Sequence, residues 1–162
     1  SVYGPREQHK GRMASVVFHF VSQYRAEGRV KLFEGCDGYS NGEQRRDFVS
    51  VGDVVRVNMW FLDHPEVSGI YNVGTGRCQS FNDVAVAAVN ACRAAEGQSA
   101  LTLDQMQTQG IVTYIAFPEA LKGKYQSHTE ADISSLRRAG YDASFYSVEE
   151  GTTRYIEHLL KA

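Results

Sequence analysis

The sequence has few cysteines, no long hydrophobic run and no marked excess of charge of either sign. Its longest apolar run, Met59 to Leu62, is far too short to cross a bilayer, which takes about 20 apolar residues. The formal net charge is −2, and the basic residues are scattered. We therefore expect no membrane segment and no nucleic-acid partner. No signal peptide is visible, although a missing N-terminus would hide one.

The three cysteines, Cys36, Cys78 and Cys92, are odd in number and lack CxxC spacing. The five histidines show no pattern such as HExxH. We therefore expect neither a disulfide framework nor a metal site. Unpaired cysteines favour a reducing, cytoplasmic setting.

The composition is typical of a soluble globular protein. Hydrophobic residues make up 43% and charged residues 22% of the sequence. The length of 162 residues is enough for one domain of ordinary size. The opening segment VYGPREQHKG, Val2 to Gly11, is typical of a hinge region rather than of the start of a free-standing domain. We therefore expect a piece of a two-domain enzyme whose first half precedes this chain.

Helical and extended patterns alternate along the sequence. Periodicity and capping signals predict helices over 13–26, 53–63, 80–97, 129–139 and 147–160, and strands over 30–33, 46–51, 70–73 and 111–117. This is α/β material with too few strands for a complete doubly wound sheet. The polar stretch 99–109 is expected to be a surface insertion without chemistry.

The predicted helix 53–63 carries apolar side chains around nearly its whole circumference. Such a helix must be covered on more than one side, which a small domain alone rarely provides. We therefore expect it to pack against a partner domain. Exposure of this helix should promote self-association.

The loop from Gly4 to Arg12 is rich in hydrogen-bond donors and cations, so it could bind phosphate or place a proton-transfer group. A solvated loop is the alternative. Lys10 is the best acid/base candidate, provided that it is desolvated.

Four further features have two interpretations each. The Gly74–Gly76 turn is weakly suggestive of phosphate binding, but a tight strand-to-helix turn is favoured. Backbone amides of the Phe33–Cys36 turn could reach a ligand, and Cys36 lacks a basic neighbour that would make it reactive. His19 on the first helix is more often a packing or surface residue, and Tyr125 could contact a nucleotide or sugar or be buried in the core.

Taken together, the segments VYGPREQHKGRMAS, KLFEG, RRDFVSVGDV, SGIYNVGTGR, FPEALKGKYQ and EADISSLRRAGYD resemble the C-terminal half of the ADP-L-glycero-D-manno-heptose 6-epimerases, which are extended short-chain dehydrogenases/reductases. RDFV-x-V-x-DV and YNVGTG are shared across that superfamily, whereas REQHKGRMAS, KLFEG and LKGKYQ are narrower. The resemblance covers essentially all 162 residues.

The resemblance implies an isomerase of carbohydrate metabolism that inverts C6 of ADP-D-glycero-D-manno-heptose for the lipopolysaccharide inner core. It implies oxidation to a ketone and re-reduction by NADP, with the cofactor held mainly by an N-terminal Rossmann domain. It also implies a homopentamer. Segments 1–47, 77–128 and 141–162 would form the small substrate domain, and 48–76 and 129–140 would return to the cofactor domain.

Residue roles carried over by resemblance make Lys10 the acid/base group and a cofactor contact, and Val2 a second cofactor contact. The implied substrate contacts are Arg12, His19, Phe33, Glu34, Gly35, Cys36, Arg46 and Tyr125. Arg46 is the natural partner of the ADP diphosphate, because a guanidinium binds phosphate in a bidentate fork. Position 12 varies in the family, and Ser1 takes no role.

The glycine-rich cofactor loop and the family's Tyr-x-x-x-Lys pair are absent from this sequence. We therefore expect the chain alone to be inactive. Two alternatives remain open: the corresponding part of another nucleotide-sugar epimerase or reductase, and an inert module that binds a sugar nucleotide.

Overall fold

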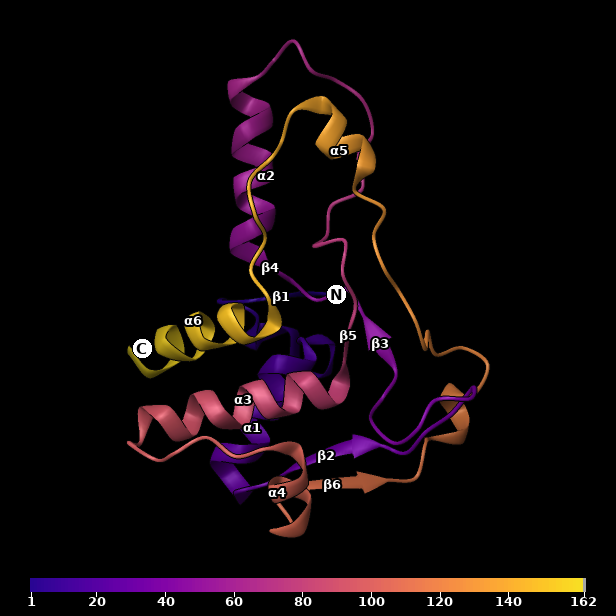
Figure 1. Ribbon diagram of the computed structural model, residues 1–162, viewed down its shortest axis with the longest axis vertical. Coiled ribbons are helices and arrows are strands. Elements are labelled where there is room, and N and C mark those ends of the chain that lie inside the picture. The colour runs from indigo at the N-terminus through magenta and orange to yellow at the C-terminus, as the bar shows by residue number, and fades with distance from the viewer. Residues whose placement is uncertain (162) are drawn as a thin grey trace.

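The computed structural model describes residues 1–161. Figure 1 shows a broad body, in which α1, α3 and α6 lie together, and an arm, which carries α2 and α5 away from it. Among the described residues, no helix has the length and apolarity needed to span a membrane.

The elements in chain order are β1 (Val2–Tyr3), the 3-10 helix η1 (Gln8–Met13), α1 (Val16–Glu27), β2 (Val30–Phe33), β3 (Arg45–Arg46), β4 (Val49–Ser50), α2 (Val51–Asp63), β5 (Gln79–Ser80), α3 (Phe81–Ala95), α4 (Leu103–Thr108), β6 (Val112–Ile115), the 3-10 helix η2 (Glu119–Leu121), α5 (Ser134–Ala139) and α6 (Val148–Lys161). The strands pair as β1 with β4 and β2 with β6, both parallel, and β3 with β5, antiparallel.

The body is built around α3, which lies between α1 and α6. Ser80 begins this helix with a capping box, because its hydroxyl accepts from Asp83 N while Asp83 accepts from Ser80 N. The apolar stripe predicted on α3 is buried, with Val84, Ala88 and Val89 fully covered. The predicted cap of α6, Ser147 with Glu150, is also present.

The arm consists of residues 51–76 and 129–146, and it has a small hydrophobic cluster of its own. Val57, Leu136, Tyr141 and Phe145 are buried there. The opposite side of α2 is open, and its exposed apolar side chains are Val55, Met59 and Leu62. The expectation that α2 has more apolar surface than this chain covers therefore agrees with the structure.

Asp47 connects the body to the arm. Its buried carboxylate accepts hydrogen bonds from the amides of Thr75 and Gly76, both at 3.0 Å, and of Ala131 at 3.2 Å. A second buried carboxylate, Asp53 in α2, accepts from the Tyr146 amide at 2.8 Å. Asp47 thus attaches the arm to the body, whereas Asp53 holds the two segments of the arm together, and both carboxylates do so by satisfying backbone amides.

Several predicted elements differ from those observed. The strand over 70–73 is wrong, because within the described residues no strand pairs with it. The strand over 46–51 divides into β3 and β4, since the chain changes partner from β5 to β1 at Asp47 and Phe48. The helix over 129–139 begins only at Ser134, because the Thr129 and Ala131 amides are bound to Arg45 and Asp47.

The stretch 99–109 lies mostly at the surface, as expected, but it also contains a short helix with one buried side chain. Thr102 and Gln105 form a capping box that begins α4. Met106 of that helix is fully buried in the core of the body. The segment therefore contributes to packing, which its polar sequence did not indicate.

Candidate functional site

Two adjoining cavities in the body bring together most of the predicted substrate residues. One, of about 430 Å³, is lined by Arg12, His19, Phe33 and Tyr125, among others. The other, of about 570 Å³, is lined by Val2, Arg12, Arg46 and Tyr125. Both cavities share walls made by Arg12, Ala14, Val16, Phe81 and Tyr125. We refer to the two together as the trough.

Arg46 is held in the trough by aromatic rings. Its guanidinium carbon lies 4.9 Å from the ring centre of Tyr125 and 5.8 Å from that of Phe81. Nη2 donates to the Gln126 carbonyl at 2.9 Å, and the buried Nε has no hydrogen-bond partner among the described residues. This geometry fixes a cation that retains donor capacity, which suits an anionic ligand.

Tyr125 belongs to an aromatic group at one wall of the trough. Its ring packs edge to face on Phe33 at 6.2 Å and on Phe117 at 5.2 Å. Burial raises the pKa of the Tyr125 phenol, and the neighbouring Arg46 charge opposes that rise. The hydroxyl therefore stays protonated at neutral pH. Tyr125 packs against neighbouring aromatic rings and also lines the trough, and its contact with a nucleotide or sugar remains a prediction.

The donor-rich loop is not a freely solvated segment, because Glu7 anchors it. The Glu7 side chain is buried and accepts from the Gly4 amide and the Ser15 hydroxyl, both at 3.0 Å, and from the Ser15 amide. A Cβ at Gly4 would lie 2.3 Å from Val51 Cγ1, so no other residue fits there. The anchored loop carries Arg12 into the trough.

Lys10 lies on η1 and is exposed, and it lines neither cavity of the trough. The desolvation that an acid/base lysine requires is therefore not provided by the described residues. Val2 is also exposed, at 53%, and lies at the rim of the larger cavity. His19 lines the smaller cavity, and its Nε2 lies 3.3 Å from the Arg12 carbonyl oxygen.

The Phe33–Cys36 turn contributes one side chain to the trough, that of Phe33. The Glu34 amide donates to Ile115 O and the Gly35 amide to Asn41 Oδ1, both at 2.8 Å, so these donors are already used. A Cβ at Gly35 would lie 1.9 Å from a carbonyl oxygen, which explains the glycine. Cys36 accepts from Gln44 Nε2 at 3.5 Å outside the trough. Ligand roles for Glu34, Gly35 and Cys36 remain predictions.

The Gly74–Gly76 turn is a structural turn rather than a phosphate site. Its amides at Thr75 and Gly76 are bound by the Asp47 carboxylate, whose charge would repel phosphate. Among the described residues, therefore, this turn cannot hold the pyrophosphate of a dinucleotide. Cofactor contacts at Val2 and Lys10 remain predictions.

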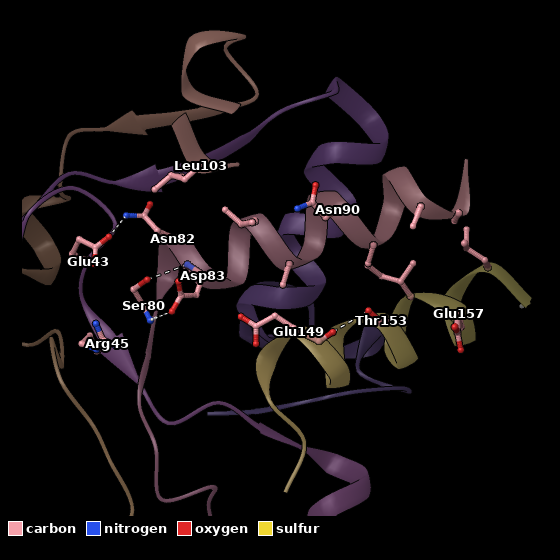
Figure 2. A pocket seen from close by; sticks show the side chains of 17 residues that line it. Glu43, Arg45, Ser80, Asn82, Asp83, Asn90, Leu103, Glu149, Thr153 and Glu157 are labelled. Carbon is pink, nitrogen blue, oxygen red and sulfur yellow. Dashed lines mark hydrogen bonds between the residues drawn. The ribbon is translucent and has the colours of Figure 1, made fainter. Parts of the chain in front are cut away.

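A third cavity, of about 810 Å³, lies between α3 and α6 and contains none of the predicted site residues (Figure 2). Its polar side chains are already engaged: Ser80 and Asp83 cap α3, Asn82 Nδ2 donates to the Glu43 carboxylate, and Asn90 binds the backbone of Leu101. Although it is larger than either cavity of the trough taken alone, this cavity offers less unused binding capacity than the trough.

Sequence reasoning missed Phe81 and Gln44, which line the trough, and Glu7 and Asp47, which position it. Phe81 and Gln44 come from separate segments, and neither forms a recognisable motif with the predicted residues. The signal for Asp47 was available, because an aspartate beside Arg45 and Arg46 in a buried strand needs partners.

Comparisons with known proteins bear on the fold and on the resemblance drawn from the sequence. Residues 1–74 match the NAD dependent epimerase/dehydratase family. The α/β fold resembles part of the extended short-chain dehydrogenases/reductases of the epimerase and dehydratase type, which agrees with the predicted fold class.

The resemblance drawn from the sequence is confirmed more narrowly. Over its full length the chain is 85% identical to the ADP-L-glycero-D-manno-heptose-6-epimerase of Thiobacillus denitrificans and covers 49% of it. It is 30% identical to the Helicobacter pylori ADP-L-glycero-D-manno-heptose-6-epimerase structure, with a TM-score of 0.70 over 43% of that chain. The Thermotoga maritima UDP-glucose 4-epimerase with UDP-glucose follows at 25% identity, TM-score 0.67 and 44% of that chain. The chain thus spans about half the length of these relatives.

Proposed function

We propose that this chain is the substrate-binding part of an ADP-heptose 6-epimerase that converts ADP-D-glycero-D-manno-heptose into its L-glycero epimer for lipopolysaccharide synthesis. The observation that carries the proposal is the trough, which joins Arg12 and Arg46 to an aromatic wall. The 85% identity to the Thiobacillus denitrificans relative supports the choice of substrate.

In this proposal the residues of the trough bind and orient the sugar nucleotide. Arg46 binds the diphosphate, because it lines the larger cavity, two rings hold its guanidinium, and a guanidinium matches the geometry of phosphate. Arg12 adds a second cation at the wall that the two cavities share. The protonated Tyr125 hydroxyl donates to the sugar, and the rings around it cover the sugar's apolar face.

The nicotinamide cofactor, which we propose to be NADP, supplies hydride removal and return at C6 and is bound outside the described residues. Lys10 then becomes the group that holds or moves the proton of the C6 hydroxyl, and it becomes desolvated when a cofactor domain covers η1. Without that domain we expect no turnover. We place the enzyme in the cytoplasm because its three cysteines are free. We expect its copies to form a homo-oligomer.

The test of turnover joins this chain to the part of the Thiobacillus denitrificans relative that it does not cover. We expect the joined protein to epimerise ADP-heptose and the 162-residue chain alone to be inactive. Lys10→Ala in the joined protein should lower kcat by about 100-fold or more, the usual contribution of a general acid or base. Lys122→Ala, at an exposed lysine outside the trough, is the matched control. Unchanged turnover in Lys10→Ala would remove the catalytic assignment.

The test of binding uses Arg46→Ala in the same joined protein. Affinity for ADP-heptose should fall by about 10- to 100-fold, since a charged hydrogen bond contributes about 1.5–3 kcal/mol. The difference should shrink at high salt, whereas Arg29→Ala, outside the trough, should bind normally. Preference for UDP-glucose would favour another nucleotide-sugar epimerase. If the joined protein binds ADP-heptose but does not epimerise it in the presence of NADP, the result would favour an inert module that binds a sugar nucleotide.

A further inference from the structure

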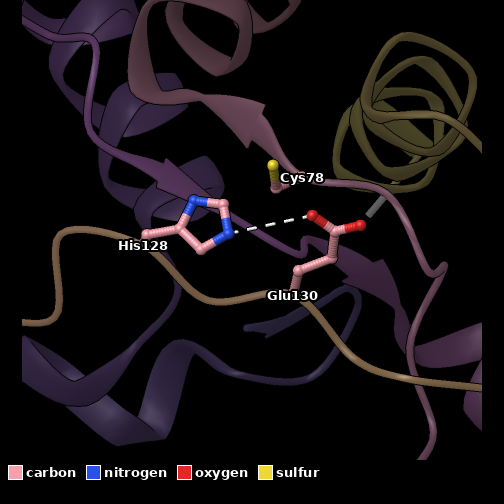
Figure 3. A group of neighbouring side chains, drawn as sticks. All are labelled: Cys78, His128 and Glu130. Carbon is pink, nitrogen blue, oxygen red and sulfur yellow. Dashed lines mark ion pairs between the residues drawn. The ribbon is translucent and has the colours of Figure 1, made fainter.

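Three metal-binding side chains that the sequence separates meet beside β3. The ligand atoms of Cys78, His128 and Glu130 all lie within 4.8 Å of one another. Figure 3 shows the imidazole and the carboxylate facing each other, with the thiol of Cys78 close to both. His128 Nε2 is 3.8 Å from Glu130 Oε2. The spacing of these residues matches no metal motif, which is why the sequence predicted no metal site.

The fold assembles this cluster across a single strand. Cys78 directly precedes β5, which pairs antiparallel with β3. Segment 127–130 lies beside Arg45, because the Arg45 amide donates to Ser127 O at 2.8 Å and the Thr129 amide donates to Arg45 O at 3.1 Å. Alternation along an extended segment places His128 and Glu130 on the same face. The cluster therefore depends on regular backbone pairing and not on a chance surface encounter.

We propose that Cys78, His128 and Glu130 form a binding site for a divalent transition-metal ion of the zinc class. Thiolate, imidazole and carboxylate are the ligands that zinc takes, at donor distances of about 2.0–2.3 Å. Tetrahedral geometry then requires ligand atoms about 3.3–3.8 Å apart. The His128–Glu130 separation of 3.8 Å is within about 0.5 Å of the value that a nitrogen and an oxygen ligand require. The remaining separations need a shift of about 1 Å, which these half-buried and exposed side chains can make.

The ligand set also fixes the class of ion. A thiolate favours zinc, cobalt or copper over magnesium or calcium, which prefer oxygen ligands. Arg45 Nη2 donates to the Cys78 carbonyl at 3.3 Å, so a cation already lies nearby and a weakly held hard ion gains little there. Three protein ligands leave the fourth position to water or to a small ligand.

Metal binding would stiffen one wall of the trough. His128 follows Tyr125 by three residues, and the intervening Gln126 carbonyl accepts from Arg46. An ion shared by Cys78, His128 and Glu130 would tie segment 125–130 to the start of β5, across β3. The inference goes beyond the proposed function and does not depend on it, because metal binding is measured without turnover.

The experiment titrates the reduced, chelator-treated chain with Co²⁺ and follows its absorption. We expect one Co²⁺ per chain, with a thiolate charge-transfer band in the near ultraviolet and tetrahedral bands in the visible, all displaced by Zn²⁺. Cys78→Ser should abolish the charge-transfer band. Loss of a group that only orients a metal ligand weakens metal affinity by about 10- to 100-fold. His128→Ala and Glu130→Gln remove a ligand itself, so each should weaken the affinity for Co²⁺ by more than that.

Matched controls separate this site from adventitious binding. Cys36→Ser and His158→Ala change the same residue types elsewhere and should bind Co²⁺ as the unaltered chain does. Circular dichroism confirms that each variant folds, and His128→Ala alters an exposed side chain. Co²⁺ spectra without a charge-transfer band, or a band lost in Cys36→Ser but kept in Cys78→Ser, would overturn the proposal.

Hydrogen exchange gives a second measurement. Zn²⁺ should slow exchange at amides 125–131 at least several-fold in the unaltered chain and leave their rates unchanged in His128→Ala. Equal exchange with and without saturating Zn²⁺ would overturn the proposed stiffening of the trough wall.

Discussion

The body and the arm both present strongly apolar helices, but they cover them to different extents. In the body, α3 has α1 on one side and α6 on the other, and its apolar stripe is buried. In the arm, α2 is covered on one side only, and Met59 and Leu62 are 52% and 72% exposed. A helix that is apolar around its circumference therefore buries all of its apolar side chains only when other elements pack on every side of it.

The two regions also differ in what holds them. The body is stabilised by a continuous hydrophobic core, whereas the arm has a small cluster, is attached to the body through Asp47 and is held together internally by Asp53. The body thus buries its apolar surface in a core of its own, whereas the arm leaves part of its apolar surface uncovered.

The largest expected effect on stability comes from two substitutions that each remove a large buried side chain, one in the core of the body and one in the core of the arm. Phe20→Ala in the body should lower the free energy of unfolding by about 3–5 kcal/mol, because the side chain is 4% exposed. Leu136→Ala, at a fully buried site of the arm, should cost about 2–5 kcal/mol but appear as local opening of the arm. Hydrogen exchange of α2 and α3 distinguishes the two. Equal loss of protection in both helices for Leu136→Ala would show that body and arm unfold as one unit.

A smaller effect is expected at the junction. Asp47→Ala removes the acceptor of three backbone amides, and unsatisfied buried groups cost about 1–3 kcal/mol each without adding fully. We expect a loss of about 3 kcal/mol in thermal or denaturant unfolding, with the Thr75 and Ala131 amides exchanging faster. Asp142→Ala, at an exposed aspartate of the arm, should be close to neutral. A neutral Asp47→Ala would mean that hydrophobic contact alone attaches the arm.

The open side of α2 should affect association more than stability. Replacing Met59 and Leu62 together by lysine should change the free energy of unfolding by within about 0.5 kcal/mol, as at other exposed sites. Self-association of the 162-residue chain should decrease, because an exposed apolar surface is removed. Sedimentation measures it, with Asn58→Lys as a control that adds charge without removing apolar area. A chain that is strictly monomeric before any substitution would contradict the expectation.

Much of the body could be predicted because its signals are local. Ser80 with Asp83 and Ser147 with Glu150 are capping pairs three residues apart, and Gly28 ends α1 with a φ of 71°. The strand 30–33 was predicted with its observed bounds. Each signal reports a backbone requirement that neighbouring residues satisfy.

The failures share a non-local cause. Residues 70–73 have the composition of a strand, but a strand needs a partner, and none pairs with them among the described residues. The start of α5 is delayed because Asp47, far away in the sequence, binds the Ala131 amide. In the trough, Arg46 and Tyr125 were predicted by resemblance, whereas Phe81 and Gln44 became visible only when distant segments were placed together. The cluster of Cys78, His128 and Glu130 was hidden for the same reason.

The smallest expected effect is a pH dependence at the start of α6, within the body. Hydrogen bonds from the Ser147 amide and hydroxyl lower the pKa of Glu150 below its usual value of 4.5. The folded state then favours the charged carboxylate, so this cap stabilises α6 fully above the pKa of the unfolded chain and loses its effect as the pH falls through the folded pKa. Glu150→Gln should therefore lower stability slightly at neutral pH and not at all in acid. Glu157→Gln, exposed further along the same helix, should show no such pH dependence. Carboxyl NMR titration together with denaturant unfolding tests this, and a Glu150 pKa at or above the unfolded value would remove the cap as a source of stability.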